Sequence, residues 1–123
     1  MYSGMTNSAI GWQKKIRKFV DKELIPWEVH AELNKGELPE EIEKKHINIA
    51  KSYGLAGMGI SKEEGGLELG MFERMIIWEQ LGRVTNALSW CFPEVQDWMV
   101  KNCNQYQKEK YLKPLLNAEK REC

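Results

Sequence analysis

Apolar residues recur every three or four positions through the first quarter of the chain, and charged residues fill the positions between them. This spacing is typical of an amphipathic helix with one face in a core. Pro26 has no N–H for the helical ladder, so we expect the helix to bend or break there. A short continuation should end at Gly36, which suits a left-handed helix terminus. The predicted core stripe is Trp12, Ile16, Phe19, Val20, Leu24 and Trp27.

Two further helices are expected over residues 39–53 and 71–83. Pro39 suits the first position of a helix, and Gly54 suits the position after its end. In the region 71–83 the apolar residues point in several directions, which predicts a helix surrounded by others. The buried face of the earlier helix should comprise Leu38, Ile42, His46, Ile49, Ala50 and Tyr53.

The remaining helical patterns cover residues 86–102 and 105–117. Pro93 lies inside the first, where it should kink or split the helix, unless it begins a new helix at its first turn. The glycine-rich stretch 55–70 is predicted to be a loop packed onto the body, and Gly65–Gly66 indicates a turn with positive φ. No segment alternates like a strand. The expected fold is all-α, a helical bundle of about five to six helices in one domain spanning residues 1–123.

Charge and hydropathy exclude several classes of partner. The 123 residues carry 18 Lys plus Arg and 18 Asp plus Glu, so the net charge gives no reason to expect nucleic acid or an anionic membrane. No apolar run approaches the roughly 20 residues of a membrane-spanning helix. Met1–Ile10 lacks the basic and apolar segments of a secretory signal. We therefore expect a cytoplasmic protein.

Cysteine and histidine usage argues against a metal site. Cys91, Cys103 and Cys123 form no CxxC pair, and His30 and His46 are the only histidines. An odd number of cysteines without a disulfide framework favours reduced thiols. We predict no metal ligand in this chain.

Catalytic motifs are also missing. The sequence has no GxGxxG and no P-loop, and the glycines of 54–70 lack the spacing of a phosphate cradle. His46 is interpreted as a core histidine. Glu79 fits either a buried general base or an ion pair with Arg83, one helical turn away, and the ion pair is favoured. Cys91, between two aromatic residues, is expected to be a small buried apolar residue. We predict no catalytic residue in this chain.

The region 88–100 is the candidate site, because three large aromatic residues surround a proline that interrupts the helical pattern. One interpretation is core packing. The other is that a broken helix with polar positions lines a ligand cavity. The candidate ligand-binding residues are Trp90, Phe92, Pro93 and Trp98.

Five motifs in order resemble the N-terminal domain of acyl-CoA dehydrogenases, from about residue 8 onward. The chain departs from the family pattern at Cys103, where the family has glycine, around Ser61–Lys62, where it has proline, and at Asn117–Glu119. The motifs are IRKFVDKELIP with GELPEEI (residues 16–26 and 36–42), YGLAGMGI (53–60), EEGGL (63–67), WEQLGR (78–83) and QKEKYLKPLL (107–116).

The resemblance implies a three-part enzyme with a β-barrel-like middle domain and a C-terminal four-helix bundle. Such enzymes remove two hydrogens from the α and β carbons of an acyl-CoA, using a glutamate base and FAD, and an electron-transfer flavoprotein reoxidises the flavin. The main flavin contacts and the glutamate would follow Cys123, so this chain alone should bind no FAD and be inactive. The resemblance assigns one wall of the acyl pocket to the helix expected at 86–100.

Several alternatives stay open. The chain fits a truncated dehydrogenase, a free-standing, non-catalytic helical interaction module, or the N-terminal domain of an acyl-CoA oxidase or flavin monooxygenase relative. The abrupt ending at Lys120–Cys123 favours the truncation. We also expect a homo-oligomer, a mitochondrial matrix location if the source is eukaryotic, and an exposed apolar surface involving Trp78, Trp90 and Trp98 on the third and fourth helices.

Overall fold

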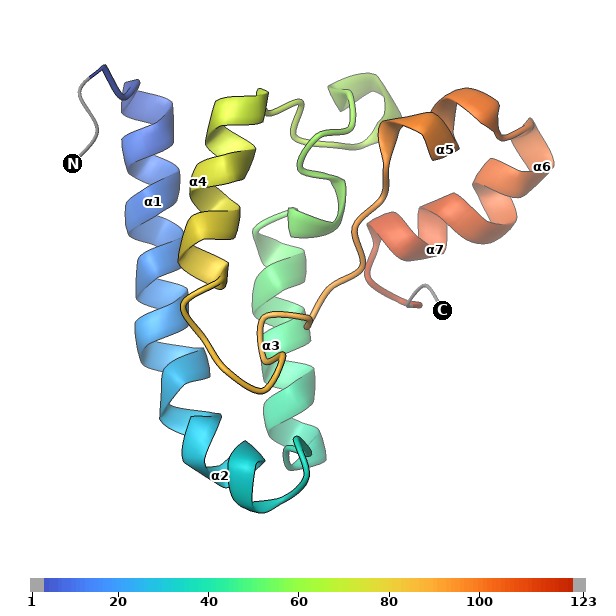
Figure 1. The fold of residues 1–123 in the computed structure, drawn as a ribbon. Helices are drawn as coiled ribbons and strands as arrows, with labels where there is room; N and C mark the ends of the chain where they lie inside the picture. The colour runs from blue at the N-terminus through green and yellow to red at the C-terminus, as the bar shows by residue number, and fades with distance from the viewer. Residues whose placement is uncertain (1–3, 121–123) are drawn as a thin grey trace. The chain divides into compact units, whose positions relative to one another are not determined.

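A computed structural model describes residues 4–120, and this part of the chain is helical and contains no β-strand. A π-helical turn, Val20–Leu24, and a 3-10 turn, Ile25–Trp27, join α1 to α2, and a second π-helical turn, Lys108–Leu112, joins α6 to α7. Two short 3-10 turns, Leu55–Gly57 and Lys62–Glu64, lie between α3 and α4. Apart from these turns, the described residues form five continuous helical segments, which confirms the expected all-α fold. The helices are α1 (Asn7–Phe19), α2 (Glu28–Leu33), α3 (Glu40–Ser52), α4 (Met71–Leu81), α5 (Asp97–Asn102), α6 (Gln105–Gln107) and α7 (Lys113–Leu116), as Figure 1 shows.

The chain divides into two compact units. The first unit comprises residues up to Glu40 together with Gly70–Ser89, and so contains α1, α2 and α4. The second unit comprises Glu41–Leu69 together with the residues from Trp90 onward. It contains α3 apart from its first residue, and α5, α6 and α7.

In the first unit α1 lies along α4 (Figure 1). Thr6 caps α1, and its Oγ1 accepts a hydrogen bond from the Ala9 N–H at 3.1 Å. Such a cap satisfies one of the N–H groups that a helix start leaves without a partner. Trp12 and Trp27 are half-buried, and the predicted stripe is confirmed at its centre, where Ile16, Phe19, Val20 and Leu24 are buried.

Both π-helical turns end two residues before a proline, Pro26 in one case and Pro114 in the other. A proline ring collides with the carbonyl four residues earlier and supplies no N–H to it. A π-helical turn widens the helix so that N–H groups reach back five residues. The wider turn accommodates each proline without ending the helical segment, and the predicted bend at Pro26 is confirmed. The continuation ends at Gly36 with φ +83°, as expected.

In the second unit α3 ends two residues before Gly54, whose φ of +72° confirms the predicted terminator. His46 and Ala50 are buried in this helix, and the other predicted core positions are half-buried. The following loop folds back on itself, because Leu67 N–H donates to the Gly57 carbonyl at 3.0 Å and Leu69 N–H donates to the Met58 carbonyl at 2.9 Å. With Met58 buried, the loop packs as expected.

The two glycines of the loop turn serve different purposes. Gly65 has φ +92°, which confirms the predicted left-handed turn. Gly66 has no positive φ, and is required because a Cβ there would lie 2.1 Å from the carbonyl oxygen of Ile60. The double glycine therefore combines one unusual backbone conformation with one close approach of two backbone segments.

The prediction of a helix over residues 86–102 is wrong for most of this range. Only Asp97–Asn102 is helical, and Pro93 lies in a non-helical segment four residues before α5 begins. Asn86 and Ala87 both have positive φ, which is incompatible with a right-handed helix. Pro93 in turn disfavours helical backbone at Phe92. Pro93 thus neither kinks a helix nor begins one.

Candidate functional site

The segment that contains the candidate residues is fixed to the loop after α3 within the second unit. Val95 N–H donates to the carbonyl of Ala56 at 2.8 Å. Val95 is buried in one apolar cluster with Ile60 of the loop and Leu112 of the last helical segment. Residues 90–96 thus form a non-helical strap that is anchored at Val95 through both its backbone and its side chain.

The structure separates the four candidate residues into two pairs. Phe92 and Pro93 are buried, whereas Trp90 is 73% exposed and Trp98, in the first turn of α5, is 62% exposed. The core-packing interpretation therefore holds for Phe92 and Pro93. For Trp90 and Trp98 it is wrong, because most of each indole ring faces outward. The expected surface exposure of these two residues is confirmed, although not on a helix common to both.

Two exposed indoles, Trp90 at the start of the strap and Trp98 two residues after its end, supply apolar surface. Indole rings combine a large apolar area with few rotatable bonds, so they bind apolar groups at little cost in conformational entropy. The neighbouring acidic residue Asp97 forms an ion pair with Lys101 at 2.6 Å within α5. The arrangement is suited to contact with an apolar ligand or protein surface.

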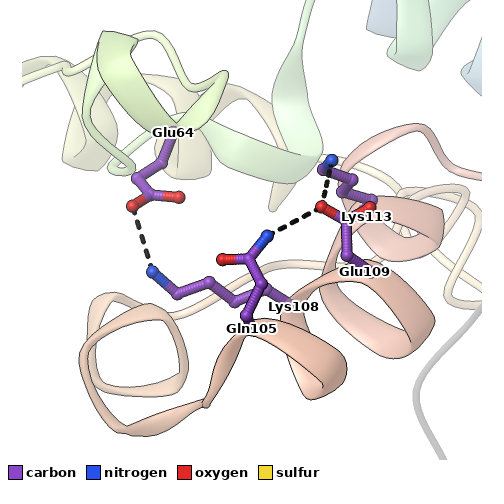
Figure 2. A network of polar contacts seen from close by, with 5 residues as sticks. All are labelled: Glu64, Gln105, Lys108, Glu109 and Lys113. Atoms are coloured by element: carbon purple, nitrogen blue, oxygen red, sulfur yellow. Dashed lines mark hydrogen bonds and ion pairs between the residues drawn. The ribbon is translucent and has the colours of Figure 1, made fainter.

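Helix-to-loop contacts hold the last helical segment in place, as Figure 2 shows. Lys108 Nζ contacts Glu64 Oε1 of the loop at 3.2 Å, and Glu109 Oε1 accepts hydrogen bonds from Lys113 at 2.6 Å and from Gln105 at 2.9 Å. The hydrogen bond from Lys113 lowers the pKa of Glu109 below its usual 4.5, and the nearby ammonium charge and Gln105 act in the same direction. Gln105, Glu109 and Lys113 are exposed and Lys108 is half-buried, and their contacts join turns of this segment to one another and to the loop.

Two reciprocal hydrogen bonds between Asn104 and Gln107 cap the start of this segment. Asn104 Oδ1 accepts from the Gln107 N–H, and Gln107 Oε1 accepts from the Asn104 N–H, each at 2.9 Å. This reciprocal pair is a capping box. Lys110 Nζ then donates to the Tyr106 hydroxyl at 2.8 Å, a contact that raises the pKa of Lys110.

The sequence analysis did not predict a polar cluster around Gln80 in the first unit. Gln80 is only 2% exposed, and its Oε1 accepts from Arg17 Nε at 3.2 Å and from Arg83 at 3.4 Å. Arg83 also pairs with Asp21 at 2.9 Å. Gln80 lies three residues after the buried Ile77, so helical periodicity places it on the buried face, where a polar residue needs partners. The polar residue at a buried position of the helical pattern was therefore the feature of the sequence from which this cluster could have been predicted.

The other residues considered for chemistry have structural surroundings. Glu79 is exposed, so it is not a buried base, and Arg83 forms an ion pair with Asp21 at 2.9 Å. His46 is buried, as expected for a core histidine. Cys91 is buried and Cys103 is half-buried, both as free thiols, and Cys123 lies outside the described residues.

Within residues 4–120 no three His, Cys, Asp or Glu side chains gather as they would around a metal ion. No helix of the described part combines the length and the apolar character needed to cross a bilayer.

The comparisons with known proteins agree with the resemblance noted in the sequence. No curated protein and no solved structure matches the chain at a significant level. A family model described as "Acyl-CoA dehydrogenase, N-terminal domain" matches residues 7–119, nearly the whole chain. The matched range contains every helix of the structure and all four candidate residues. The chain therefore belongs to the family of acyl-CoA dehydrogenase N-terminal domains.

Proposed function

We propose that the chain is the N-terminal domain of an FAD-dependent acyl-CoA dehydrogenase and contributes a wall of its acyl pocket. The observation that carries this proposal is the exposure of Trp90 and Trp98 in a chain of this family. The wall is the non-helical strap 90–96 and the first turn of α5, instead of the long helix expected from the sequence. Within the strap, Phe92 and Pro93 are buried.

The glycine loop of this chain does not fit the phosphates of FAD. Its N–H groups at Leu67, Glu68 and Leu69 already donate to carbonyls of the same loop. Gly66 lies against the Ile60 carbonyl, which leaves no space for a phosphate at that point. In the proposed enzyme the flavin would be held by the domains that follow, and no catalytic step is assigned to a residue of this chain.

The role of these residues is to bind the acyl tail and keep water away from it. Burying apolar surface contributes roughly 0.8 kcal/mol per CH₂ group. Indole rings that close the far end of a pocket limit how many such groups fit. The preference for acyl chain length is therefore the property that Trp90 and Trp98 would control.

The test uses the full-length protein that carries this chain. Trp98→Ala should shift the kcat/KM profile toward longer acyl-CoA substrates, because it removes a wall. Tyr106→Ala is the matched control, since Tyr106 is also an exposed aromatic residue of the second unit. If Trp90→Ala and Trp98→Ala both keep the parent's chain-length profile, as the control should, these residues do not line the pocket.

Acyl-CoA as substrate, an electron-transfer flavoprotein as electron acceptor and a homo-oligomeric state are parts of the same proposal. The alternative functions are an interaction module without catalysis and a related oxidase or monooxygenase. The coding sequence after residue 123 distinguishes them. A flavin-binding domain there supports an enzyme, and the fate of the electrons, to a flavoprotein or to oxygen, separates a dehydrogenase from the other two.

A further inference from the structure

The buried side chain of Gln80 brings two arginines of the first unit together. Arg17 on α1 donates from Nε to Gln80 Oε1 at 3.2 Å, and Arg83, just past the end of α4, donates from Nη1 to the same oxygen at 3.4 Å. Gln80 is only 2% exposed, so the packing around it holds this oxygen in place. The amide oxygen satisfies two N–H groups, but it is neutral and compensates for neither positive charge.

Only one of the two positive charges is compensated within this cluster. Asp21 pairs with Arg83 Nη2 at 2.9 Å. Two arginines and one aspartate leave one positive charge in excess. Lys14 is exposed and lies three residues before Arg17, on the same side of α1, where it adds to the positive potential. The cluster therefore lacks one negative charge, although the whole chain is neutral.

Arg17 keeps most of its capacity for hydrogen bonds. A guanidinium group carries five N–H donors. The Nε–H of Arg17 is bonded to Gln80, and within residues 4–120 its two Nη groups have no hydrogen-bond or ion-pair partner. Because the guanidinium is planar, the bond to Gln80 also orients the edge formed by the two Nη groups, which faces a different direction. Arg17 is exposed, so a ligand can reach this edge.

The charge of the cluster decides which anion fits the Nη edge. Two parallel N–H groups of an arginine match two oxygens of a carboxylate or of a phosphate. A carboxylate carries the single negative charge that the cluster lacks. A phosphate monoester carries about 1.5 to 2 negative charges at neutral pH, and Asp21, which follows Arg17 by four residues, would repel the excess. The charge balance therefore favours a carboxylate.

We propose that Arg17, with Arg83 beside it, is a binding site for one carboxylate group, which is supplied by an acidic side chain of a partner protein or by a small organic acid. The Nη groups of Arg17 bind both oxygens, and Arg83 adds the attraction of its charge. Gln80 is a positioning residue, because its buried oxygen orients Arg17 before the ligand arrives and so reduces the conformational entropy lost on binding. The site belongs to the first unit and the two exposed tryptophans of the proposed pocket wall to the second, so the proposal does not rest on the acyl pocket.

The Nε–Hε signals of the arginine side chains in a proton–nitrogen NMR spectrum report on this site directly. Sodium acetate replaces sodium chloride stepwise at a constant ionic strength of about 0.2 M, so that general screening does not change. The Arg17 signal should shift and saturate with acetate, and the signal of Arg74, which is half-buried in α4, is the internal reference. An Arg17 signal that does not respond to acetate, or that responds to inorganic phosphate at lower concentration than to acetate, would overturn the proposal.

The variant Gln80→Glu supplies the missing negative charge from within the chain, with almost no change of side-chain shape. It should weaken acetate binding at least about fivefold, because the new carboxylate repels the ligand at short range. Arg17→Gln should bind no acetate, followed through the Arg83 signal. The control Lys51→Gln removes a positive charge from an exposed position of the second unit and should bind acetate like the parent. Circular dichroism checks that each variant is folded, and an unchanged acetate affinity in Gln80→Glu or in Arg17→Gln would contradict the proposal.

Two short peptides distinguish the sources of the carboxylate. Ala-Glu-Ala with blocked termini presents one acidic side chain, and Ala-Gln-Ala with blocked termini is the same peptide without the charge. If Ala-Glu-Ala binds more tightly than acetate, the site is assigned to an acidic side chain of a partner, and if acetate binds at least as tightly, it is assigned to a small organic acid. Both results support a carboxylate site. Equal responses of the Arg17 signal to the two peptides would overturn it, since they would show that the carboxylate charge is not recognised.

Discussion

Gly66 has no space for a side chain. A Cβ at this position would lie 2.1 Å from the Ile60 carbonyl oxygen and 2.5 Å from its carbonyl carbon, both backbone atoms. Backbone atoms of a hydrogen-bonded loop move away only at a cost, and overpacking of this kind typically costs about 1–3 kcal/mol. Glycine is thus required at position 66 because the backbone there lies against the backbone of Ile60 in the same loop.

We predict that Gly66→Ala lowers the free energy of unfolding by about 1–3 kcal/mol, measured by urea denaturation. The matched control is Gly11→Ala in α1, where an added Cβ meets nothing within 4 Å. That variant should gain about 0.5–1 kcal/mol, since alanine has the higher helix propensity. Equal effects of the two substitutions would show that the approach of Gly66 to Ile60 is not a constraint.

Glu109 provides a prediction about pH. Its pKa is lowered in the folded protein, chiefly by the hydrogen bond from Lys113. A lowered folded-state pKa contributes stability above the unfolded pKa, here the ordinary value of 4.5, and this stability is lost as the pH falls through the folded pKa. NMR titration should therefore find the Glu109 carboxyl titrating below 4.5.

Lys113→Gln should raise the pKa of Glu109 toward its ordinary value, since it removes the largest cause and the ammonium charge together. Gln105→Ala removes only the weaker hydrogen bond and should raise the pKa by less. An unchanged titration of Glu109 in Lys113→Gln would contradict the contact shown in Figure 2.

The strap 90–96 is the element whose form differs most from the sequence prediction. Pro93 is buried in it, and Val95 N–H binds the Ala56 carbonyl. Proline restricts the unfolded chain and suits an extended backbone, so its value here lies in a rigid strap. A proline inside a helix would have cost about 3 kcal/mol.

Pro93→Ala should accordingly destabilise the protein by about 1 kcal/mol or more, through a freer unfolded chain and lost packing of the ring. The far-UV circular dichroism should not change. Pro26→Ala is the contrasting variant, because Pro26 is exposed within a helical segment, and it should be neutral or stabilising. A gain of both stability and helix content in Pro93→Ala would favour the helix originally expected over 86–102.

At the scale of the whole molecule, α4 presents a large apolar surface. Met71, Phe72, Met75 and Trp78 are exposed on it, while Ile77 and Leu81 are buried. This confirms the predicted exposed surface on the third helix of the sequence. Soluble monomers rarely expose contiguous apolar patches of this kind unless they serve an interaction.

We predict that the chain binds the dye 8-anilinonaphthalene-1-sulfonate through this surface and associates at high concentration. Association through α4 should persist at high salt, because it depends on burying apolar surface. Met75→Gln should reduce dye fluorescence, and Val29→Gln on α2 is the control for an isolated exposed apolar side chain. A chain that binds no dye at any concentration would contradict this function of α4.

The chain alone should also retain no flavin. The loop that might resemble a phosphate cradle uses its N–H groups internally. After incubation with FAD and desalting, the protein should show no stoichiometric flavin absorbance and no acyl-CoA oxidation. A stoichiometric yellow complex would show that described residues other than this loop bind the cofactor.

The sequence by itself determined the elements that depend on local interactions. The stripe from Ile16 to Leu24, the terminators Gly36 and Gly54 and the turn at Gly65 follow from helical periodicity and from the steric freedom of glycine, which act within a few residues. The order of five motifs was also sufficient to indicate the family, which the match over residues 7–119 shows.

Tertiary structure decided what depends on contacts between distant residues. An apolar pattern over 86–102 is compatible with helix or strap, and residues 90–96 form a strap because Val95 binds Ala56 and packs on Ile60 and Leu112. The buried Gln80 has a hydrogen-bond partner only because the fold brings Arg17, 63 residues earlier, and Arg83 to its side-chain oxygen. The sequence shows which residues are apolar. Only the folded chain determines that Phe92 is buried and that Trp90 and Trp98 are exposed.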